Sequence, residues 1–237
     1  MRRIVQLSGG KDSTALLLMC IHKNYRVDEA VFFDTGMEFN AVYKTIDYLE
    51  VICKGNGIKL TKLYPRIPFK EKMFNIEVHK RDGSIGCGYS WCGGVCRWGT
   101  TDKLQTLESY CKGSIELIGI AFDEQFRLAK KRKGNKEFPL STWKITEHDA
   151  LNYCYDNGIY WVENAGAGDV RLYDILDRVS CWCCGNKNLK ELRNMYKYLP
   201  DYWEKLKEYQ GRTNRPFRRN GKTIFDLEDR FRLELTK

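Results

Sequence analysis

The strongest constraint on the fold is a glycine-rich loop that joins an apolar run to an apolar, helix-forming segment. Residues 3–7 form the apolar run, the loop follows directly, and residues 13–22 form the helical segment. This order predicts a strand, a loop and a helix. Because glycine lets the backbone approach an anion and N–H groups at a helix N-terminus bind phosphate, the loop predicts a phosphate site. The loop residues are Ser8, Gly9, Gly10, Lys11, Asp12 and Ser13.

Further strands and helices alternate along the chain after this loop. The expected strands are residues 27–33, 58–63 and 115–120, and the expected helices are residues 40–54, 101–111 and 146–156. This alternation predicts an α/β fold, Rossmann-like, with a parallel sheet flanked by helices. In such folds nucleotides bind where the strands end, in a crevice of the sheet.

Two regions depart from the alternation. Residues 65–97 are rich in glycine and cysteine and contain two prolines, which indicates an insertion rather than sheet. The last part of the chain has a helical pattern broken at Pro200, followed by a basic, loop-like stretch. We therefore expect a nucleotide-binding domain over residues 1–185, with the Cys-rich insertion inside it, and a small helical, basic extension over residues 186–237.

The charge balance favours a polyanionic partner. The chain carries 40 Lys and Arg against 31 Asp and Glu, a formal net charge of +9, and the basic excess continues through the C-terminal third. Such an excess attracts nucleic acid or several phosphates. A solvated basic face without a partner is the alternative interpretation.

Cysteine is the other unusual residue type, with ten in the chain. The apolar run at the N-terminus is interrupted by Gly9 before a signal peptide can form, and no stretch approaches the ~20 apolar residues of a membrane span. We therefore expect a cytoplasmic protein whose cysteines are thiols or metal ligands. They fall into two short groups, Cys87, Cys92, Cys96 and Cys181, Cys183, Cys184, and into four expected core residues, Cys20, Cys53, Cys111 and Cys154.

Two motifs resemble those of a known superfamily. Ser-Gly-Gly-Lys-Asp-Ser after a strand resembles the PP-loop of ATP pyrophosphatases, which binds the pyrophosphate end of ATP during adenylation. Residues 33–39, Phe-Asp-Thr-Gly-Met-Glu-Phe, resemble a segment of the phosphoadenosine phosphosulfate (PAPS) reductase branch. The resemblance implies an adenine nucleotide alpha hydrolase-like fold. On the alternative interpretation, Asp34 and Glu38 cap a helix.

Two further segments extend the resemblance. Residues 119–127 are similar to the family's Gly-x-Arg-x-x-Glu-Ser segment, with Ala121 in place of the arginine, and residues 138–143 are similar to its Pro-Leu-x-x-Trp stretch. The resemblance implies ATP, or a sulfonucleotide (PAPS or APS, adenosine phosphosulfate), with Mg²⁺. It places the nucleotide on the loop residues together with Asp34, Thr35 and Gly119. Lys11, Asp12 and Asp34 are the expected catalytic residues.

The family comparison also bears on the cysteines. In its cluster-bearing members a Cys-Cys pair and a later Cys-x-x-Cys hold a [4Fe–4S] cluster; here Val95 replaces the first Cys of the pair. The resemblance implies the ligands Cys92, Cys96, Cys181 and Cys184, with zinc as the alternative to the cluster. Cys87 and Cys183 are alternates or redox-active thiols.

These expectations lead to one function hypothesis and two alternatives. Sulfonucleotide reductases carry a nucleophilic cysteine in a C-terminal tail, and no cysteine follows Cys184. The leading hypothesis is therefore adenylation and sulfur transfer to tRNA or DNA, with a sulfur-donor protein as partner. A reductase that releases sulfite and a non-catalytic nucleotide-binding module are the alternatives. The expected nucleic-acid contacts are Arg212, Arg215, Arg218, Arg219 and Lys222, with Tyr202, Trp203, Tyr209 and Phe217 as stacking residues or, alternatively, core.

Overall fold

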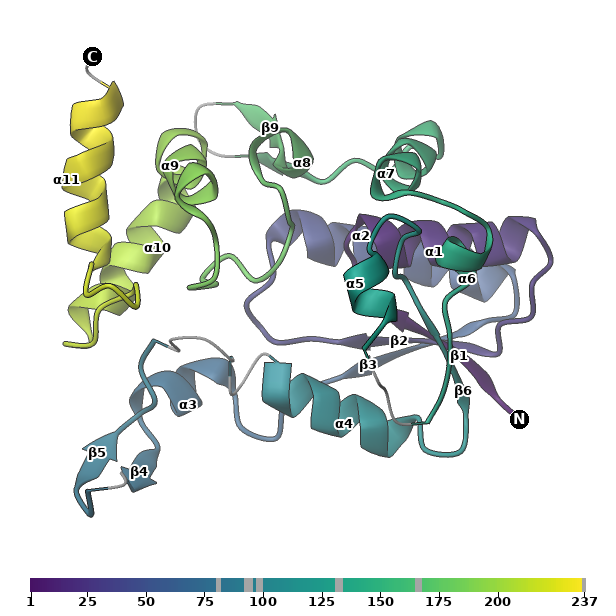
Figure 1. Cartoon of the computed structure of the whole chain (residues 1–237), viewed down its shortest axis with the longest axis horizontal. Helices are drawn as coiled ribbons and strands as arrows, with labels where there is room; N and C mark the ends of the chain where they lie inside the picture. The colour runs from purple at the N-terminus through teal and green to yellow at the C-terminus, as the bar shows by residue number, and fades with distance from the viewer. Residues whose placement is uncertain (80–81, 92–95, 97–99, 131–133, 165–167, 236–237) are drawn as a thin grey trace. The chain divides into compact units, whose positions relative to one another are not determined.

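The computed structural model describes residues 1–79, 82–91, 96, 100–130, 134–164 and 168–235. Its chain divides into two compact units (Figure 1). The first, here called the sheet unit, comprises Met1–Asp34, Asn40–Tyr64 and Leu104–Trp161. The second, the helical unit, comprises Thr35–Phe39, Pro65–Lys103 and Val162–Lys237. The units therefore do not divide the chain at residue 185.

The sheet unit is built on a five-stranded sheet of order β3-β2-β1-β6-β7, in which every neighbouring pair is parallel. The predicted α/β fold with a parallel sheet is confirmed. The central strands are apolar and buried, and Ile4 and Val5 of the middle strand are fully inaccessible to solvent. The strands are β1 (Arg3–Leu7), β2 (Glu29–Phe33), β3 (Lys59–Leu63), β6 (Ile115–Ile118) and β7 (Asn135–Glu137).

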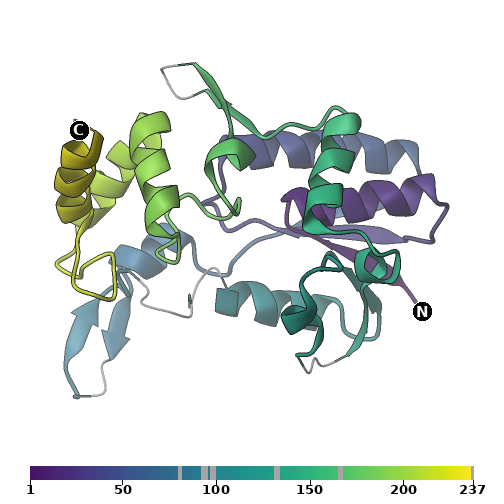
Figure 2. The same cartoon turned by 45° about the horizontal axis from the view of Figure 1, so that its top comes forward.

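Helices cover both faces of this sheet. Two of them, α1 and α2, lie over one face and α4 lies over the other, as both views show (Figure 1, Figure 2). Leu107 of α4 packs with Ile4, Val31 and Phe33 of the sheet. The helices of this unit are α1 (Lys11–His22), α2 (Asn40–Gly55), α4 (Asp102–Tyr110, whose first two residues belong to the helical unit), α5 (Gln125–Leu128), α6 (Pro139–Thr142) and α7 (Glu147–Asp156).

The helical unit consists of short hairpins and helices. Asn188 and Glu191 form a capping box at the start of α9, and Pro200 is the first residue of α10, because proline at that position lacks only an N–H that has no helical partner. Its strands are β4 (Glu77–His79), β5 (Ile85–Cys87), β8 (Val162–Asn164) and β9 (Asp169–Arg171). Its helices are α3 (Phe69–Phe74), α8 (Leu172–Ile175), α9 (Leu189–Tyr198), α10 (Pro200–Gly211) and α11 (Ile224–Leu235).

Aromatic side chains form the core of the helical unit. The rings of Phe39 and Tyr202 meet edge to face with centroids 4.8 Å apart, and Trp203 packs on Phe231 at 5.8 Å. The four aromatic residues considered for base stacking are all at most 5% exposed: Tyr202, Trp203, Tyr209 and Phe217. The stacking interpretation is therefore wrong for these residues and the core alternative holds.

None of the helices in the described part of the chain is long and apolar enough to cross a membrane.

Candidate functional site

The Ser8–Ser13 loop follows the carboxyl end of β1 and leads into α1. Its two serine hydroxyls fix its shape: the Ser8 N–H donates to Ser13 Oγ at 3.0 Å, and the two hydroxyl oxygens are also 3.0 Å apart. Ser13 Oγ donates in turn to the Gly10 carbonyl at 3.1 Å. Gly10 is the N-cap of α1 and offers no side-chain cap, so the first N–H groups of the helix point at the loop.

Close packing explains two glycines of the site. Gly9 has φ +75°, and a Cβ atom there would lie 2.7 Å from Val42 Cγ1. A Cβ atom on Gly119 would lie 2.9 Å from the backbone of Asp12 and Ser13. Gly119, predicted as a nucleotide contact, is thus placed against the backbone of the loop, where a side chain would displace it.

Trp161 is hydrogen-bonded to the backbone of the loop. Its indole Nε1–H donates to the Gly9 carbonyl at 2.7 Å, and its side chain is only 1% exposed. The sequence analysis missed this residue. A buried tryptophan reads as core, and no local pattern shows that its N–H reaches a loop 152 residues away.

Three carboxylates surround the start of α1. Asp12, Glu124 and Glu147 each offer an oxygen within 4.8 Å of the other two. Lys11 Nζ lies 2.7 Å from Asp12 Oδ1 and 3.4 Å from Glu147 Oε1. Burial raises the pKa of Asp12; Lys11 opposes this shift, and the charges of Glu147 and Glu124 add to it. Oxygen ligands gathered in this way suit Mg²⁺.

The segment at residues 34–39 is divided between the two units. Asp34 directly follows β2 in the sheet unit, where its carboxylate accepts from the Tyr43 hydroxyl at 2.8 Å. Thr35 belongs to the helical unit, and its hydroxyl donates to Glu38 Oε1 at 3.0 Å and lies 3.5 Å from Cys181 Sγ. The structure thus places the predicted nucleotide contact Thr35 beside a cysteine.

The helical unit also contains the two cysteine groups from which the metal ligands were predicted. Cys181 Sγ lies 3.5 Å from Glu38 Oε1. Burial is the main cause that raises the pKa of Cys181, and the charge of Glu38 raises it further. Burial likewise raises the pKa of Cys183, and the neighbouring thiols of Cys181, Cys184 and Cys96 add to it. Thiols whose ionisation is opposed by burial and by neighbouring negative charge lose their protons when a cation binds among them.

The remaining predicted ligands differ in their surroundings. Cys92 lies outside the described residues. Cys87 is exposed in β5 and its thiol donates to the Phe74 carbonyl at 3.2 Å. The described cysteines are all free thiols, and the four expected in the core, Cys20, Cys53, Cys111 and Cys154, are buried.

Residues of the predicted extension contact both cysteine-bearing segments. Arg218 donates to the carbonyls of Gly185 and Lys187, at 3.2 and 2.6 Å. Phe217 packs edge to face on Trp91, with centroids 4.9 Å apart.

Three of the arginines expected to contact nucleic acid have partners within the chain. Arg212 lies over the Phe74 ring at 3.9 Å, Arg215 donates to the Tyr89 carbonyl at 3.3 Å, and Arg218 makes the contacts given above. These contacts give the three arginines roles in packing and in fixing loops, and their contact with nucleic acid stays a prediction.

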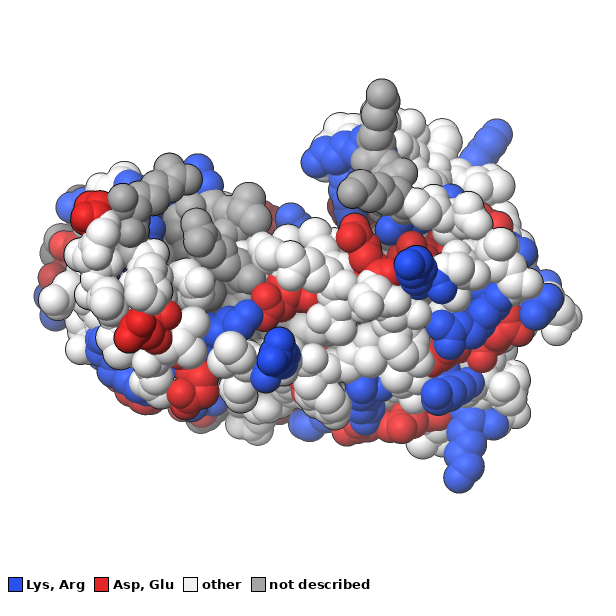
Figure 3. All heavy atoms as spheres, turned by 90° about the horizontal axis from the view of Figure 1, so that it is seen from below, with Lys and Arg blue, Asp and Glu red and all other residues white. Residues whose placement is uncertain are grey.

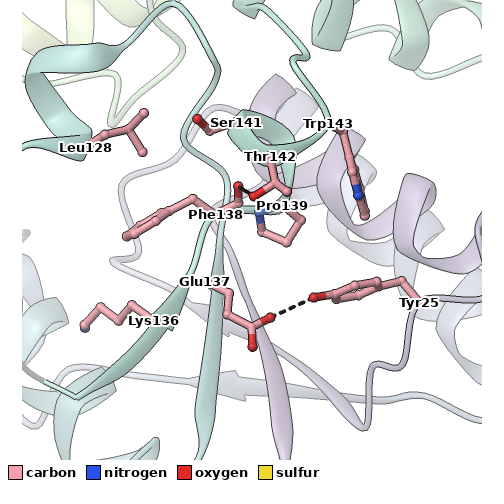
Figure 4. A pocket seen from close by; sticks show the side chains of 9 residues that line it. All are labelled: Tyr25, Leu128, Lys136, Glu137, Phe138, Pro139, Ser141, Thr142 and Trp143. Carbon is pink, nitrogen blue, oxygen red and sulfur yellow. Dashed lines mark hydrogen bonds between the residues drawn. The ribbon is translucent and has the colours of Figure 1, made fainter.

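A cavity of about 430 Å³ lies in the sheet unit beside β7 and α6 (Figure 4). At its base the Tyr25 hydroxyl donates to Glu137 Oε2 at 2.7 Å. No residue of the phosphate loop lines it. Its lining residues are Tyr25, Leu128, Lys136, Glu137, Phe138, Pro139, Ser141, Thr142 and Trp143.

The family model described as the phosphoadenosine phosphosulfate reductase domain matches residues 2–186, most of the chain. The chain belongs to the PAPS reductase family. This family member is also 27% identical over 219 residues to an uncharacterized protein of Methanocaldococcus jannaschii. The alignment covers 89% of the present chain and 42% of the relative, so the chain spans less than half the length of the protein it matches.

The family domain contains the phosphate loop, the segment at residues 34–39 and the Cys181–Cys184 turn. It ends before Lys187, so Phe217 and Arg218 lie outside it. The PAPS reductase-like part of this chain therefore has its second cysteine segment held in place by residues that follow the family domain.

The replacement of the family's arginine by Ala121 leaves Glu124 with another basic neighbour. Ala121, which replaces the arginine of the family's segment, is fully buried, and its N–H donates to Glu124 Oε2 at 3.2 Å. Arg127 donates to both oxygens of the same carboxylate, at 2.6 and 2.7 Å. In this PAPS reductase family member a basic group thus stands beside Glu124, but it comes from a helix turn further along the chain.

Proposed function

We propose that this PAPS reductase family protein binds ATP on the Ser8–Ser13 loop and activates an acceptor by adenylation. The observation that carries the proposal is the loop itself, braced by Trp161 and Gly119, with Lys11 and three carboxylates at its helix end. Such pre-organised charge stabilises a departing pyrophosphate without covalent catalysis. Nucleotide binding is common to the family; ATP as the nucleotide and the reaction type are our proposal.

Each group has a proposed role in that step. Asp12, Glu124 and Glu147 hold Mg²⁺, and Lys11, released from its carboxylate partners, neutralises the phosphates. The hydroxyls and amides of the loop bind the remaining phosphate oxygens. Asp34, at the end of β2, contacts the nucleoside.

The proposed reaction has two displacements. An acceptor oxygen attacks the α-phosphorus of ATP, the bond from that phosphorus to the bridging oxygen breaks, and pyrophosphate leaves. A hydrosulfide then attacks the activated carbon, AMP leaves with the original oxygen, and the thiol proton passes to solvent. No electrons are exchanged with an outside reagent.

The cysteines of the helical unit fit a metal centre. Burial raises the pKa of Cys183, the charges of Cys181, Cys184 and Cys96 raise it further, and the four residues belong to one compact unit. We propose Cys96, Cys181 and Cys184 as ligands, with Cys92 as the fourth and Cys183 as its alternate. When bound, a [4Fe–4S] cluster supplies sulfur chemistry there, whereas zinc supplies a structural link.

A nucleic acid, tRNA or DNA, is the proposed acceptor, and a sulfur-donor protein the proposed partner. The support is the net charge of +9, together with Arg219 and Lys222, which are exposed. Basic and acidic side chains are interspersed over the face shown in Figure 3. We therefore propose that overall charge attraction brings the nucleic acid to the protein, and we assign its binding to no single surface patch.

The reductase alternative is favoured by the family description itself. It predicts that PAPS or APS replaces ATP and that sulfite is released without any nucleic acid. A nucleotide-binding module without catalysis predicts ATP binding and no turnover.

The deciding experiment follows the fate of each nucleotide. Anaerobically purified protein is incubated with ATP, Mg²⁺, sulfide and tRNA or DNA, and pyrophosphate and thiolated product are measured; a parallel reaction contains APS or PAPS and a thiol reductant. Pyrophosphate release that requires nucleic acid supports the proposal. Sulfite release in the parallel reaction establishes the reductase alternative and overturns it.

Lys11→Ala provides the matched variant, with Lys54→Ala as its control. Lys54 lies exposed in the last turn of α2. Because the ammonium of Lys11 is the loop's own cation, its loss lowers pyrophosphate release at least about tenfold, which corresponds to about 1.4 kcal/mol of transition-state stabilisation. The Lys54 variant retains full activity.

A further inference from the structure

Lys187 is a buried lysine that the reaction described above does not use. Only 3% of the residue is exposed. Two successive turns, from the Cys184 N–H to the Cys181 carbonyl (3.1 Å) and from the Lys187 N–H to the Cys184 carbonyl (3.2 Å), fold the chain back on itself. The lysine thereby returns to the segment that carries the cysteines.

Within the described part of the chain, the ammonium of Lys187 has no carboxylate partner. Among the described residues, its Nζ contacts Ser180 Oγ at 3.4 Å and the face of the Phe39 ring, whose centroid is 5.4 Å away, and no carboxylate oxygen within ion-pair distance. The nearby carboxylate of Glu191 is used elsewhere, accepting the N–H groups of Arg178 and Asn188 at 3.1 and 2.9 Å. A buried charge without an opposite charge nearby is strongly unfavourable, so an anion beside this side chain would stabilise its charged form.

The negative charges that act on Lys187 come from two sources. Burial lowers the pKa of Lys187, and Glu191 and the side chains of Cys184, Cys181 and Cys183 act in the opposite direction. Three of these four groups are thiols, which become thiolates when they bind a metal. The lysine is therefore placed beside a group of side chains that gains negative charge on metal binding.

We propose that the ammonium of Lys187 is the fixed counter-charge of a cysteine-ligated centre formed by the Cys181–Cys184 segment. The inference rests on the metal centre in the proposed function and adds a positioning residue to it. A centre with several thiolates has a net negative charge, so a fixed cation favours its loaded form and its more reduced form. Lys187 thus slows metal loss, and in an iron–sulfur centre it raises the reduction potential.

Hydrogen bonds fix the backbone around Lys187. Arg218 donates to the Lys187 and Gly185 carbonyls, at 2.6 and 3.2 Å. With its carbonyl bonded to Arg218 and its N–H bonded to Cys184, the backbone of Lys187 is fixed beside the cysteine-bearing segment.

The test compares Lys187→Met with Lys187→Arg and with Lys190→Met. Lys190 is a matched control on the same segment, because its side chain is 64% exposed and pairs with Asp177 at 3.1 Å. Each protein is purified anaerobically and loaded with ferrous iron and sulfide, or with Zn²⁺. Metal content, the rate of metal loss to a chelator and, for iron, the reduction potential from an EPR-monitored titration are then measured.

The expected result is specific to charge. Lys187→Met loses its metal at least about tenfold faster than wild type, and the potential of its iron–sulfur centre shifts to more negative values. Lys187→Arg and Lys190→Met stay close to wild type. Unchanged retention and potential in Lys187→Met, with metal present in both proteins, overturn the inference and leave the proposed metal centre intact.

A second measurement separates charge from packing. In the metal-free protein, Lys187→Met removes a buried amine that has no carboxylate partner in the described part of the chain, so its melting temperature is equal to or above that of wild type, whereas in the loaded protein it is lower. Equal destabilisation of both forms, or failure of the metal-free variant to fold, shows a merely structural lysine and overturns the inference. Wild-type protein that takes up neither iron nor zinc overturns the proposed metal centre itself.

Discussion

Trp161 offers the most direct test of how the phosphate loop is held. Replacing Trp161 with phenylalanine removes the indole N–H that donates to the Gly9 carbonyl at 2.7 Å and keeps an aromatic ring in the same buried position. The carbonyl then lacks that donor in a place that water does not reach readily. We expect the loop to lose its position and ATP to bind more weakly.

The size of the effect follows from a matched comparison. The loss of the hydrogen-bond partner of a buried polar group lowers the free energy of unfolding by about 1–3 kcal/mol. Trp203 is equally buried, at 1% exposed, but its indole N–H has no hydrogen-bond partner among the described residues. Trp203→Phe therefore loses ring volume alone. Subtracting its effect from that of Trp161→Phe leaves the hydrogen bond, about 1–3 kcal/mol, or about 2–4 °C in melting temperature for each kcal/mol.

The assay is thermal unfolding with and without ATP and Mg²⁺, together with calorimetric titration of ATP. Because 1.4 kcal/mol corresponds to a tenfold change in affinity, we expect Trp161→Phe to bind ATP about tenfold more weakly. Trp203→Phe binds ATP like wild type. Unchanged ATP affinity in Trp161→Phe, or an equal loss in both variants, refutes the proposed role of this hydrogen bond.

Three further perturbations test other parts of the site. Gly119→Ala places a Cβ 2.9 Å from the loop backbone and lowers ATP affinity at least about tenfold by titration, whereas Gly55→Ala, with open space around it, leaves affinity unchanged. Asp12→Asn removes a carboxylate whose pKa is raised in the folded protein, so ionisation of this group destabilises the wild-type fold as pH rises. The metal-free variant therefore melts no lower than wild type at pH 7 and gains stability relative to it as pH rises from 4 to 7. It nevertheless loses Mg²⁺-dependent ATP binding. A lower melting temperature at pH 7 would contradict this sign. Arg218→Ala destabilises the protein by about 1–3 kcal/mol in chemical unfolding, while Arg219→Ala, whose side chain is exposed, changes it by less than about 0.5 kcal/mol.

The parallel sheet could be predicted because most of its strands carry their own pattern. Residues 3–7 and 115–118 are rich in isoleucine, valine and leucine, and both form strands. Strand β7, Asn135–Glu137, reads Asn-Lys-Glu and has no such pattern. It is a strand because it pairs with β6 at the edge of the sheet, which is a tertiary effect that a local pattern does not contain.

The site could be predicted in part for the same reason. The phosphate loop is contiguous in sequence, so its residue types reveal it. The carboxylates Glu124 and Glu147 and the indole of Trp161 reach the loop from distant segments, and only the folded chain shows this. The basic C-terminal stretch was interpreted from charge alone, which does not tell a solvated arginine from one that, like Arg218, binds carbonyls. The cysteine ligand set stays a prediction.

The contacts of Phe217 and Arg218 with the two cysteine-bearing segments also set an order of events during synthesis. The helical unit collects Thr35–Phe39, Pro65–Lys103 and Val162–Lys237, so it cannot close until the residues of α11 have left the ribosome. Until then the cysteines are exposed thiols on an unfinished chain, open to oxidation and to stray metals. A chain shortened to the matched residues 2–186 lacks Phe217 and Arg218, and with them the contacts that hold its two cysteine-bearing segments.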